Sequence, residues 1–582
     1  MTKVWKLPPH AAHADQLARE AGLPRFLAQM LINRGISDNG SVVSFLSPSL
    51  SKLEDPMLLI DMDIAVDLIL DAIENNENIV IYGDFDADGI TATALLLNFF
   101  SHLDVPVSFY IPNRFKEGYG LNPSAVEALA KEKTGLMITV DCGISDMEEI
   151  ALARRLGMKV IVTDHHQVPA DFTPICPVVN PHRPESLFPF KYLSGVGLAF
   201  FLAIAIRAAL RDRGRFKDRP EPDLRHYLDL AALGTVADMV PLQGQNRVLV
   251  RAGLERMKAP RWPGLRAIQE IADIRHTGPL SAEDLAFKLA PRLNATGRMG
   301  DAATGIRLLV AEDLSLARDL AKELNVLNGQ RRRVEQEILD QIEDTLGAGE
   351  NLEHRKTLVL SGEGWHRGVL GIVASRLVNR YHRPVVVLDI RDGLARGSGR
   401  SIPGFHLFHA LTKLAPILEK FGGHDQAAGL TLRASNIAAL AGELENLARD
   451  ALIGEALIPA IDIDAEMTLA DMSMNTLSHI NTLSPFGFGN PEPVFYAHAV
   501  EVMKSRVVGE RHLSLKVRQG ESVLDAIGFG LSEYHLPGKK FVNLVFTPEI
   551  DRWHGHERIK LKVIDLEVTG SMSKLRRLSM KS

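Results

Sequence analysis

Short apolar runs alternate with helical segments in the first third of the chain, and this alternation constrains the fold more than any other feature. The runs are rich in β-branched residues, as buried strands are, and they occupy residues 77–82, Leu136–Val140 and Lys159–Thr163. Helices are predicted at residues 90–100 and 146–156, and a further strand at 177–180. The alternation predicts an α/β fold with a parallel sheet, in which ligands bind at the carboxyl ends of the strands.

The chain has 582 residues, too many for one compact domain. From Glu312 to about Leu346, apolar residues recur at helical spacing without a proline, which predicts one long connecting helix. Strands at Thr357–Ser361 and Pro384–Leu388 predict a second α/β lobe, and alternating segments after Ile461 predict a small β-barrel. We therefore expect five segments: helices at 1–75, a first lobe at 76–311, the connecting helix at 312–347, a second lobe at 348–458 and the barrel at 459–582.

Composition argues against several classes of protein. Two cysteines, Cys142 and Cys176, cannot form a disulfide framework or a cysteine-rich zinc site, and their scarcity fits a reducing cytoplasm. The first residues contain no apolar core of the kind found in secretory signals, so none is predicted. The most apolar stretch, Leu193–Leu210, contains serine, glycine and arginine, and we interpret it as a buried helix instead of a membrane span.

Charge is unevenly distributed along the chain. The formal net charge is −6, yet residues Val494–Ser582 contain 15 Lys and Arg against 10 Asp and Glu. A basic end beside an acidic body suits an enzyme that binds nucleic acid in one place and metal cations in another. Ordinary surface variation would produce the same asymmetry, so charge alone leaves both interpretations open.

The sequence GDFDADG follows the first predicted strand and places three carboxylates close together, on Asp84, Asp86 and Asp88. Carboxylates this close repel each other and are tolerated mainly where a cation neutralises them. An EF-hand loop would need a glutamate at its twelfth position, which is Leu95 here, and helices on both sides. The pattern therefore indicates a metal site of another kind.

The next two predicted strands end in similar chemistry, with Asp141 after one and Asp164-His165-His166 after the other, while GTVADMVPL adds Asp238. One such aspartate would most simply cap a helix, but three strand ends meet at one edge of a parallel sheet. Carboxylates and imidazole without thiolate suit Mn²⁺ or Mg²⁺, and the number of ligands suits two ions about 4 Å apart. Such a pair activates water for attack on phosphorus and needs no serine or cysteine nucleophile.

The motifs that carry these residues resemble those of the DHH phosphoesterase family, and most closely the RecJ exonucleases within it. DFDADGITATA, VDCGI, TDHH and GTVADMVPL match the family's metal-binding motifs in order and spacing. PRLNATGRMGDA, GWHRGVLGIVASRL, RGSGRSIPGFHL and FGGHDQAAG resemble later motifs, the last three those of the DHHA1 domain. The resemblance covers nearly the whole chain and implies a DHH lobe, a DHHA1 lobe and a C-terminal barrel like an OB fold.

The resemblance also implies an activity, which is 5′-to-3′ exonuclease action on single-stranded DNA that releases 5′-mononucleotides in repair and recombination. The two ions would be held by Asp86, Asp88, Asp141, His165 and Asp238. Asp141 would bridge the ions, and Asp84 would be either a direct ligand or a residue that supports one. His166 would face the scissile phosphate, so the expected catalytic residues are Asp141, His165 and His166. Resemblance alone suggests a single-strand-binding protein and a RecQ-type helicase as partners of a monomeric, cytoplasmic enzyme without a membrane segment.

Motifs rich in glycine and arginine predict contacts with substrate phosphates. Glycine lets the backbone approach a phosphate, and arginine offers two parallel donors. The predicted loop RGSGRS contributes Arg396, Ser398 and Arg400, and the GGH motif contributes Gly422, Gly423 and His424. Further candidates are Arg114, Asn294 and Arg298. For any single arginine, a surface salt bridge is an equally good explanation.

Basic residues of the barrel are expected to follow the DNA backbone, and these are Lys504, Arg506, Arg511, Lys516 and Arg518. Trp553 or Phe495 would stack on a base, although packing in the barrel core is the simpler role for either ring.

Three other functions fit parts of the pattern. A DHH phosphodiesterase for very short RNA or a cyclic dinucleotide, or a pyrophosphatase of the same superfamily, would share the metal motifs. The roughly 120 residues beyond the second lobe favour a longer strand. A non-catalytic scaffold that grips single strands would have lost the carboxylates, and all of them are present.

Overall fold

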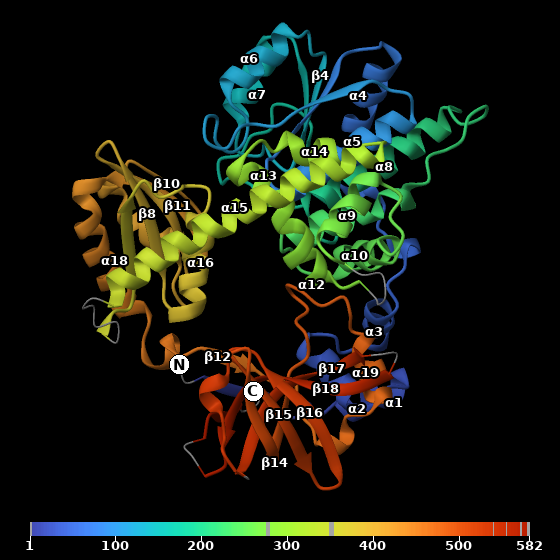
Figure 1. Cartoon of the computed structure of the whole chain (residues 1–582). Helices are drawn as coiled ribbons and strands as arrows, with labels where there is room; N and C mark the ends of the chain where they lie inside the picture. Colours follow the sequence, from blue (N-terminus) through green and yellow to red (C-terminus); the bar gives the residue numbers. More distant parts are fainter. Residues whose placement is uncertain are drawn as a thin grey trace.

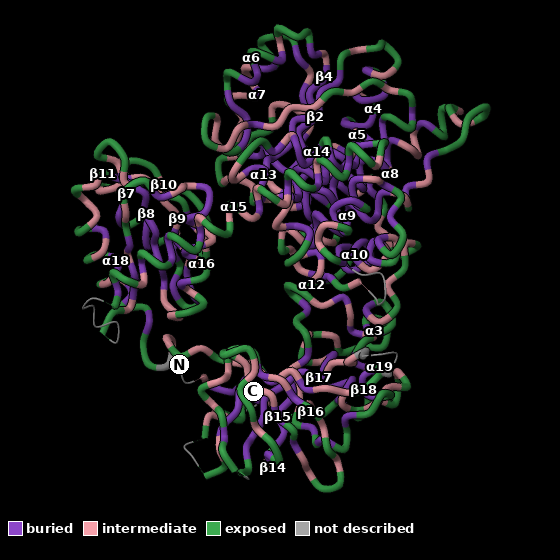
Figure 2. The backbone as a smooth tube through the Cα atoms, viewed as in Figure 1, coloured by how far each residue is buried: buried purple, intermediate pink, exposed green. Residues whose placement is uncertain are grey.

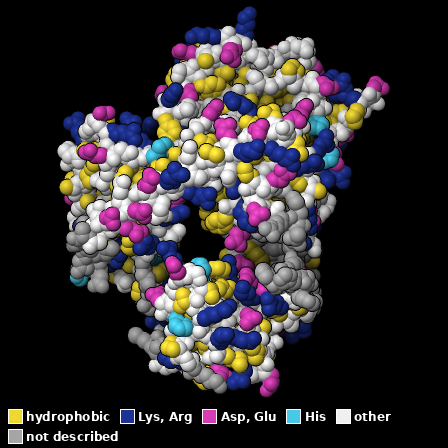
Figure 3. All heavy atoms as spheres, in the orientation of Figure 1, with side chains coloured by type: hydrophobic (Ala, Val, Ile, Leu, Met, Phe, Trp, Pro, Cys, Tyr) yellow, Lys and Arg dark blue, Asp and Glu magenta, His cyan; other side chains and the backbone are white. Residues whose placement is uncertain are grey.

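The computed structural model describes residues 3–274, 280–347, 354–538, 540–553, 556–570 and 573–578. Two α/β lobes joined by a long helix, together with a C-terminal β-barrel, surround a central opening that passes between the atoms of the space-filling view (Figure 1, Figure 3). This arrangement confirms the predicted fold class.

A five-stranded parallel sheet in the order β3-β2-β4-β5-β6 forms the centre of the first lobe. Its strands are β2 (Ile79–Gly83), β3 (Val107–Tyr110), β4 (Leu136–Val140), β5 (Lys159–Thr163) and β6 (Val178–Val179). The sequence does not predict β3, an edge strand whose side chains are only partly buried. Gly83, Val140 and Thr163 end three neighbouring strands in register, so the residues that follow them emerge side by side at one edge.

Helices cover both faces of this sheet (Figure 1, Figure 2). The face that contains Ile81 and Ile138 packs against α4 (Met62–Glu74), α5 (Ala87–His102), α8 (Gly195–Asp212) and α9 (Leu228–Ala237). The face that contains Val80 and Met137 packs against α6 (Pro123–Lys131) and α7 (Met147–Arg155). The lobe is completed by α10 (Gly244–Arg256), α11 (Pro263–Ile271), α12 (Ala282–Asp284), the π-helical turn η4 (Leu285–Leu289), α13 (Ala290–Met299) and α14 (Ala303–Leu309).

Helix α8 contains most of the apolar stretch Leu193–Leu210, and its buried side chains belong to the core of the first lobe. The interpretation of this stretch as a buried helix is therefore confirmed. Among the helices of the described residues, none combines the length and the apolar character needed to span a membrane.

The predicted connecting helix is α15 (Leu314–Gly347), which leads into the second lobe. That lobe contains β7 (Leu358–Glu363), β8 (Val385–Arg391), β9 (Leu394–Arg400), β10 (Lys420–Gly423) and β11 (Ala427–Arg433), in the order β10-β11-β9-β8-β7. Only β7 and β8 are parallel within this sheet. Helix α16 (Leu370–Tyr381) covers one face, and α17 (Leu407–Lys413) and α18 (Ile437–Ala451) cover the other.

The predicted loop RGSGRS is instead mostly strand, because Arg396–Arg400 belongs to β9. A Cβ atom on Gly397 would lie 1.9 Å from the carbonyl oxygen of Val387 in β8, so glycine permits a close approach between the strands. Arg396, Ser398 and Arg400 alternate along β9 and therefore share one face of the sheet.

The C-terminal barrel consists of β14 (Phe495–Val508), β15 (His512–Gln519), β16 (Ser522–Gly528), β18 (His556–Val568) and β17 (Lys540–Trp553). Pairing of β14 with β17 closes it. The alternating segments that predict a barrel form β15, β16 and β18. The short strand β13 (Ala465–Glu466) extends the sheet beside β14. Helix α19 (Met474–Asn481) lies between β13 and β14 in the chain.

The N-terminal segment shares its core with this barrel. It begins with β1 (Val4–Leu7), so the prediction of helices alone is wrong there; β1 pairs in parallel with β12 (Ala460–Asp462) and β19 (Leu575–Arg577). The predicted helices follow as α1 (Ala14–Ala21), α2 (Arg25–Asn33) and α3 (Asn39–Leu46). Leu27 and Leu31 of α2 pack in the same apolar cluster as Phe495 and Phe546 of the barrel.

A buried arginine joins the first lobe to the barrel side of the molecule. Arg247 of α10 is 1% exposed, and its guanidinium stacks 3.8 Å above the ring of Phe45 in α3. Its Nε donates to the carbonyl of Phe45 at 2.7 Å, and its Nη2 donates to those of Thr482 at 3.3 Å and Ser484 at 2.8 Å. Burial lowers the pKa of Arg247 to about 9. This one side chain therefore satisfies carbonyls from two other segments of the chain.

We predict that Arg247→Met weakens this junction by about 2 to 4 kcal/mol, because it leaves buried carbonyls without donors. Hydrogen exchange and limited proteolysis should show faster opening around Phe45 and residues 482–484. Arg251→Met is the matched control, since Arg251 makes a single weaker bond to the carbonyl of Leu46 at 3.2 Å. Equal protection in both variants would contradict the role assigned to Arg247.

Candidate active site

The carboxyl ends of β2, β4 and β5 bring the predicted acidic and histidine side chains together. His165 lies at the centre: its Nε2 is 3.1 Å from Asp141 Oδ1, 3.5 Å from Asp238 Oδ2 and 4.0 Å from Asp88 Oδ2. Three groups of ligand atoms lie within 4.8 Å of one another: Asp141 with His165 and His166, Asp88 with His165 and Asp238, and Asp84 with Asp86 and Asp141. All the side chains predicted to bind metal therefore meet in one cluster.

Two helix N-termini hold part of this cluster in place. Asp86 caps α5, where its Oδ1 accepts from the amides of Asp88 at 2.9 Å and Gly89 at 3.2 Å. Asp88 accepts from the first amides of α8, those of Gly195 at 2.6 Å and Val196 at 2.9 Å. The positive end of a helix dipole favours a carboxylate at both places.

The backbone approaches the cluster so closely that it excludes ordinary side chains. A Cβ atom on Gly195 would lie 2.6 Å from the Cβ of Asp141, and one on Gly234 would lie 2.8 Å from Oδ1 of Asp88. Asp141 itself has φ +63°, a conformation that costs energy for a residue other than glycine. The surrounding contacts thus keep this aspartate in a strained conformation that turns its carboxylate toward the others.

The cluster carries more negative charge than its own donors neutralise. Burial, reinforced by the neighbouring carboxylates, raises the pKa of Asp84, Asp141 and Asp238 well above the usual value, and it raises the pKa of Asp88 to about 7. Without an added cation these groups therefore tend to bind protons.

Four buried ligand atoms lack hydrogen-bond partners within the described part of the chain: Asp84 Oδ1, Asp141 Oδ1, His165 Nε2 and Asp238 Oδ2. Burial lowers the pKa of His165 to about 3, so its imidazole is neutral and has a lone pair for a metal. Buried polar atoms without partners are rare in folded proteins, and these converge from different elements. Carboxylate oxygens with an imidazole and no thiolate fit Mn²⁺ or Mg²⁺, as predicted.

Asp164 has a different role from the other aspartates. Its Oδ1 accepts from the amide of His166 at 3.0 Å and from Nδ1 of the same ring at 2.7 Å, and its Oδ2 accepts from the amide of Ile144 at 2.9 Å. Burial alone would lower the pKa of His166, but the charge and hydrogen bond of Asp164 outweigh it and raise that pKa to about 9. Asp164 therefore orients His166 and favours its protonated form, and it belongs to none of the three ligand groups.

Tyr119 is a site residue that the sequence does not predict. Its hydroxyl lies 3.2 Å from Nδ1 of His166 and donates to the backbone carbonyl of Asp141 at 3.3 Å. The residue is 52% exposed, so part of its ring faces open space beside the cluster. It lies on the loop after β3, and recognising that strand would have placed this loop at the same sheet edge.

Three of the predicted phosphate-binding arginines come together opposite the carboxylates: Arg114, Arg298 and Arg400. Burial, followed by repulsion from Arg114, lowers the pKa of Arg298 to about 10, and the same two causes lower the pKa of Arg400. Nη1 of Arg298 donates to the carbonyl of Gly368 in the second lobe at 3.0 Å, and Nη1 of Arg400 donates to Oγ of Ser398 at 2.8 Å. This group of three arginines thus combines guanidinium groups from both lobes.

The other predicted substrate residues lie around this cluster. Asn294 Oδ1 accepts from the amide of Ala87 at 2.9 Å, so Asn294 supports the loop that carries the first aspartates. Arg396 is exposed and lies on the face of β9 shared by Ser398 and Arg400. His424 belongs to the exposed turn between β10 and β11, and Gly422 and Gly423 lie at the end of β10. Within the described residues, no hydrogen bond or ion pair joins this turn to the three arginines.

In the barrel, Lys504 and Lys516 are exposed and face each other across β14 and β15, and Lys560 continues the same row beyond Asp525. Arg506 and Arg511 are exposed nearby, whereas Arg518 is paired with Glu501 at 2.8 Å.

Phe495 is fully buried, so stacking of its ring on a base is excluded, and core packing against Phe546 is its role. The side chain of Trp553 lies outside the described part of the structure.

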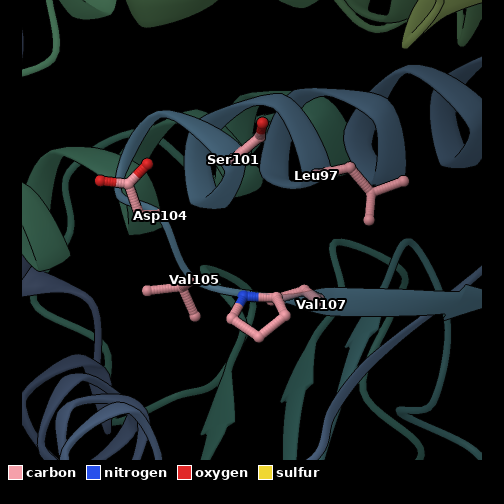
Figure 4. A pocket seen from close by; sticks show the side chains of 6 residues that line it. Leu97, Ser101, Asp104, Val105 and Val107 are labelled. Atoms are coloured by element: carbon pink, nitrogen blue, oxygen red, sulfur yellow. The ribbon is translucent and has the colours of Figure 1, made fainter.

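A separate pocket of about 410 Å³ lies between the end of α5 and the start of β3 (Figure 4). It is lined by Leu97, Ser101, Asp104, Val105, Pro106 and Val107. The pocket adjoins the amino end of β3, whereas the acidic cluster lies at the carboxyl ends of the strands. With one carboxylate and one hydroxyl, it offers no comparable set of metal ligands.

Three family profiles match the chain. They are the DHH family N-terminal domain over residues 78–235, the DHHA1 domain over 354–450 and the RecJ OB domain over 463–565. The single-stranded-DNA-specific exonuclease RecJ of Dickeya dadantii is 38% identical over 565 residues, which cover 93% of this chain and 96% of that protein. RecJ of Escherichia coli K12 is 37% identical, with 94% and 96% covered, and RecJ of Bacillus subtilis is 36% identical, with 97% and 71% covered.

Solved structures agree with this assignment. The crystal structure of Thermus thermophilus RecJ in complex with Mn²⁺ superposes with a TM-score of 0.82 at 29% identity, over 97% of this chain and 79% of that one. The same protein in complex with Mg²⁺ gives a TM-score of 0.77 at 28% identity, over 98% and 79%. Because the similarity extends over all the lobes and the barrel, the chain belongs to the RecJ family of single-stranded-DNA-specific exonucleases.

Proposed function

We propose that this protein degrades single-stranded DNA from the 5′ end by two-metal-ion hydrolysis and releases 5′-mononucleotides. The observation that carries the proposal is the convergence of four buried ligand atoms, on Asp84, Asp141, His165 and Asp238, that have no hydrogen-bond partner among the described residues. Membership in the RecJ family supports single-stranded DNA as the substrate, and the 5′-to-3′ polarity and a role in DNA repair and recombination belong to the proposal.

The residues that would hold two Mn²⁺ or Mg²⁺ ions are those of the acidic cluster: Asp84, Asp86, Asp88, Asp141, His165 and Asp238. Asp141 takes part in two of the three ligand groups, which supports it as the bridging carboxylate. Both carboxylate oxygens of Asp88 accept hydrogen bonds from amides of α8, and these bonds fix its orientation toward the site. When bound, the ions lower the pKa of a coordinated water and neutralise charge on the phosphate.

His166 is placed to act on the leaving group. Its Nδ1 donates to Asp164, and because the pKa of the ring is raised to about 9, the protonated ring carries a second proton on Nε2, away from that carboxylate. Hydrolysis breaks the bond between phosphorus and the 3′ oxygen of the terminal nucleotide, and His166 gives this oxygen its proton. The released nucleotide keeps its 5′ phosphate, and the shortened strand gains a new one.

Arg114, Arg298 and Arg400 are suited to bind the 5′-terminal phosphate. Burial lowers the pKa of all three, and repulsion from Arg114 lowers the pKa of Arg298 and Arg400 further, so an anion between them relieves repulsion. Ser398, Arg396 and the turn with Gly423 and His424 would extend this phosphate site along the second lobe. The basic row of the barrel would hold the strand farther from the cut.

Family membership also supports the remaining parts of the proposal. The protein would act as a cytoplasmic monomer beside a single-strand-binding protein and a RecQ-type helicase. Its two lobes would span residues 76–311 and 348–458, on either side of α15. Within the N-terminal segment 1–75, the part up to α3 would stabilise the barrel at 459–582, because the two share a core, whereas α4 packs in the first lobe.

The purified protein with Mn²⁺ or Mg²⁺ should shorten a single strand labelled at its 3′ end to a ladder, and release the label of a 5′-labelled strand at once as a mononucleotide. Asp141→Ala should lower this rate at least about a hundredfold, because it removes a ligand shared by two groups. Asp104→Ala, at an exposed carboxylate away from the cluster, is the control.

Activity that survives Asp141→Ala would refute the metal site. Early loss of a 3′ label would refute the polarity. Faster hydrolysis of a cyclic dinucleotide or of a short RNA than of long DNA would favour the rival phosphodiesterases.

Asp164→Asn should slow hydrolysis by about 10- to 100-fold with little change in folding, because it removes the partner that orients His166. The rate should also fall at a lower pH than in the unchanged enzyme. His166 must be protonated to act as an acid, Asp164 raises its pKa to about 9, and bound cations lower it again. The alkaline limb should therefore lie below pH 9 and move toward neutrality in the variant. An unchanged pH profile would remove His166 from the mechanism.

Arg400→Gln should raise KM for a 5′-phosphorylated strand by roughly 10- to 100-fold, through loss of charged hydrogen bonds to the phosphate. For a strand with a 5′ hydroxyl, the same variant should raise KM much less. Arg307→Gln provides the control, since Arg307 is exposed and pairs with Asp301. Equal losses on both strands would place Arg400 elsewhere than at the terminal phosphate.

A further inference from the structure

One buried carboxylate of the second lobe takes no part in the proposed mechanism. Asp389 lies in β8 and is 0% exposed, and its Oδ2 is 2.8 Å from Nε of Arg367 and 3.0 Å from Nε of Arg391. Its other oxygen, Oδ1, has no hydrogen-bond partner among the described residues. The two guanidinium groups therefore compensate the charge of this carboxylate, which would be costly to bury alone.

Asp389 lies beside the proposed phosphate-binding residues of β9. It pairs directly with Arg396, and residues directly opposite each other in a sheet share one face. The face that carries Asp389 is therefore the face that carries Arg396, Ser398 and Arg400. Asp389 thus lies at the side of the second lobe that is proposed to bind phosphate, although a carboxylate itself repels an anion.

Both arginines connect Asp389 to the loop of residues 364–369 between β7 and α16, which we call the interlobe loop. Arg367 belongs to this loop. Nη2 of Arg391 donates to the carbonyl of Trp365 in the loop at 3.3 Å. Asp389 therefore holds the interlobe loop at two points, one through a side chain of the loop and one through a carbonyl of its backbone.

The interlobe loop contacts the first lobe beside two of the proposed phosphate-binding arginines. Gly368 lies against the end of α13, where a Cβ atom on it would be 2.6 Å from the carbonyl oxygen of Arg298. The side chain of Arg298 returns to the same residue, since its Nη1 donates to the carbonyl of Gly368 at 3.0 Å. The ring of His366 meets that of Phe115 edge to face, with centroids 5.4 Å apart, and Phe115 directly follows Arg114.

We propose that Asp389 is a positioning residue for substrate binding. It fixes the interlobe loop through Arg367 and Arg391, and the loop fixes the guanidinium of Arg298 in place for the terminal phosphate. This step rests on the proposed function, since it takes Arg298 as a phosphate-binding residue. A long arginine side chain otherwise samples several conformations, and a hydrogen bond to a fixed carbonyl removes much of that freedom before substrate arrives. The second lobe thus prepares a binding group of the first.

Hydrogen exchange of the full-length protein without DNA tests the link from Asp389 to the interlobe loop. Asp389→Asn, which removes the charge but keeps the shape, should speed amide exchange in residues 364–369 by about 3- to 30-fold. Asp392→Asn is the matched control, because Asp392 is exposed in the turn after the same strand and has φ +51°, a conformation that asparagine also adopts. Unchanged exchange in Asp389→Asn, or an equal change in Asp392→Asn, would overturn the proposal.

Binding of DNA in EDTA tests the link from the interlobe loop to the terminal phosphate. For a strand of about 12 nucleotides with a 5′ phosphate, Asp389→Asn should raise Kd by about 3- to 30-fold. For the same strand with a 5′ hydroxyl, Kd should change by less than about twofold, because the group that Arg298 binds is missing. A purely structural role would change both Kd values equally or neither, and either result would overturn the proposal.

A double-mutant cycle tests whether Asp389 acts through Arg298. In an Arg298→Gln background, adding Asp389→Asn should change the Kd of the phosphorylated strand by less than about twofold, because the side chain to be fixed is already lost. Additive effects of the two substitutions would show that Asp389 acts by another route and would overturn the proposal.

Variants of Arg367 approach the same link from the other side and cover the case in which Asp389→Asn does not fold. Arg367→Leu should reproduce the loss of affinity for the phosphorylated strand. Arg367→Gln should restore most of it, because the amide nitrogen of glutamine takes the place of Nε, the atom that contacts Asp389. Equal affinities of these two variants would overturn the proposal. Absence of turnover by the unchanged enzyme with Mn²⁺ would refute the proposed function, while hydrogen exchange would still decide whether Asp389 fixes the interlobe loop.

Discussion

Repulsion among buried carboxylates is the constraint on which the arrangement of the first lobe depends. Register alone makes Asp84, Asp141 and Asp164 emerge side by side, because β2, β4 and β5 end together. Like charges at this spacing in a buried site would push the strand ends apart unless something compensated them. The fold supplies compensation from the N-terminus of α8 for Asp88, and from the ring and amide of His166 for Asp164. Asp84, Asp141 and Asp238 remain suited to divalent cations, in line with the lack of a hydrogen-bond partner for one oxygen of each among the described residues.

The opposite imbalance exists across the cleft. Arg114, Arg298 and Arg400 repel one another as the carboxylates do, and the pKa of each is lowered. The two clusters compensate each other only in part, because Asp84 and Asp86 oppose the lowering of the Arg114 pKa without outweighing burial, and Arg298 donates to the backbone of Gly368. A phosphodiester with bound cations completes both, since the cations satisfy the carboxylates and the phosphates satisfy the guanidinium groups. Substrate and metal are thus expected to increase each other's affinity.

The acidic cluster was predictable from the sequence because it depends on local pattern. Short β-branched runs identify Leu136–Val140 and Lys159–Thr163, and a parallel sheet then brings the following residues to one edge. Tyr119 was not predictable in this way, because it follows β3, an edge strand that lacks a continuous apolar run. The sequence also shows which aspartates meet but not which hydrogen bonds they make, so the separate role of Asp164 required the structure.

The errors in the prediction have a common physical origin in long-range pairing. β1 is a strand only because β12 and β19 flank it, and both lie more than 400 residues further along the chain. Glycines in RGSGRS suggested a loop, yet here they let β9 approach β8 within a distance that a side chain would forbid. The aromatic ring of Phe495 suggested a stacking residue, but closure of the barrel buries it, which no local pattern reveals.

Indifference to base sequence follows from the kinds of contact that these residues can make. The arginines are suited to bind phosphate, and the acidic cluster is suited to bind phosphate through cations; neither kind of contact reads a base edge. Under the proposed function, guanidinium groups from both lobes would hold the terminal phosphate while the scissile phosphate lies at the acidic cluster. Recognition of this kind depends on the backbone of the strand and on the space between the two lobes, and on no particular base.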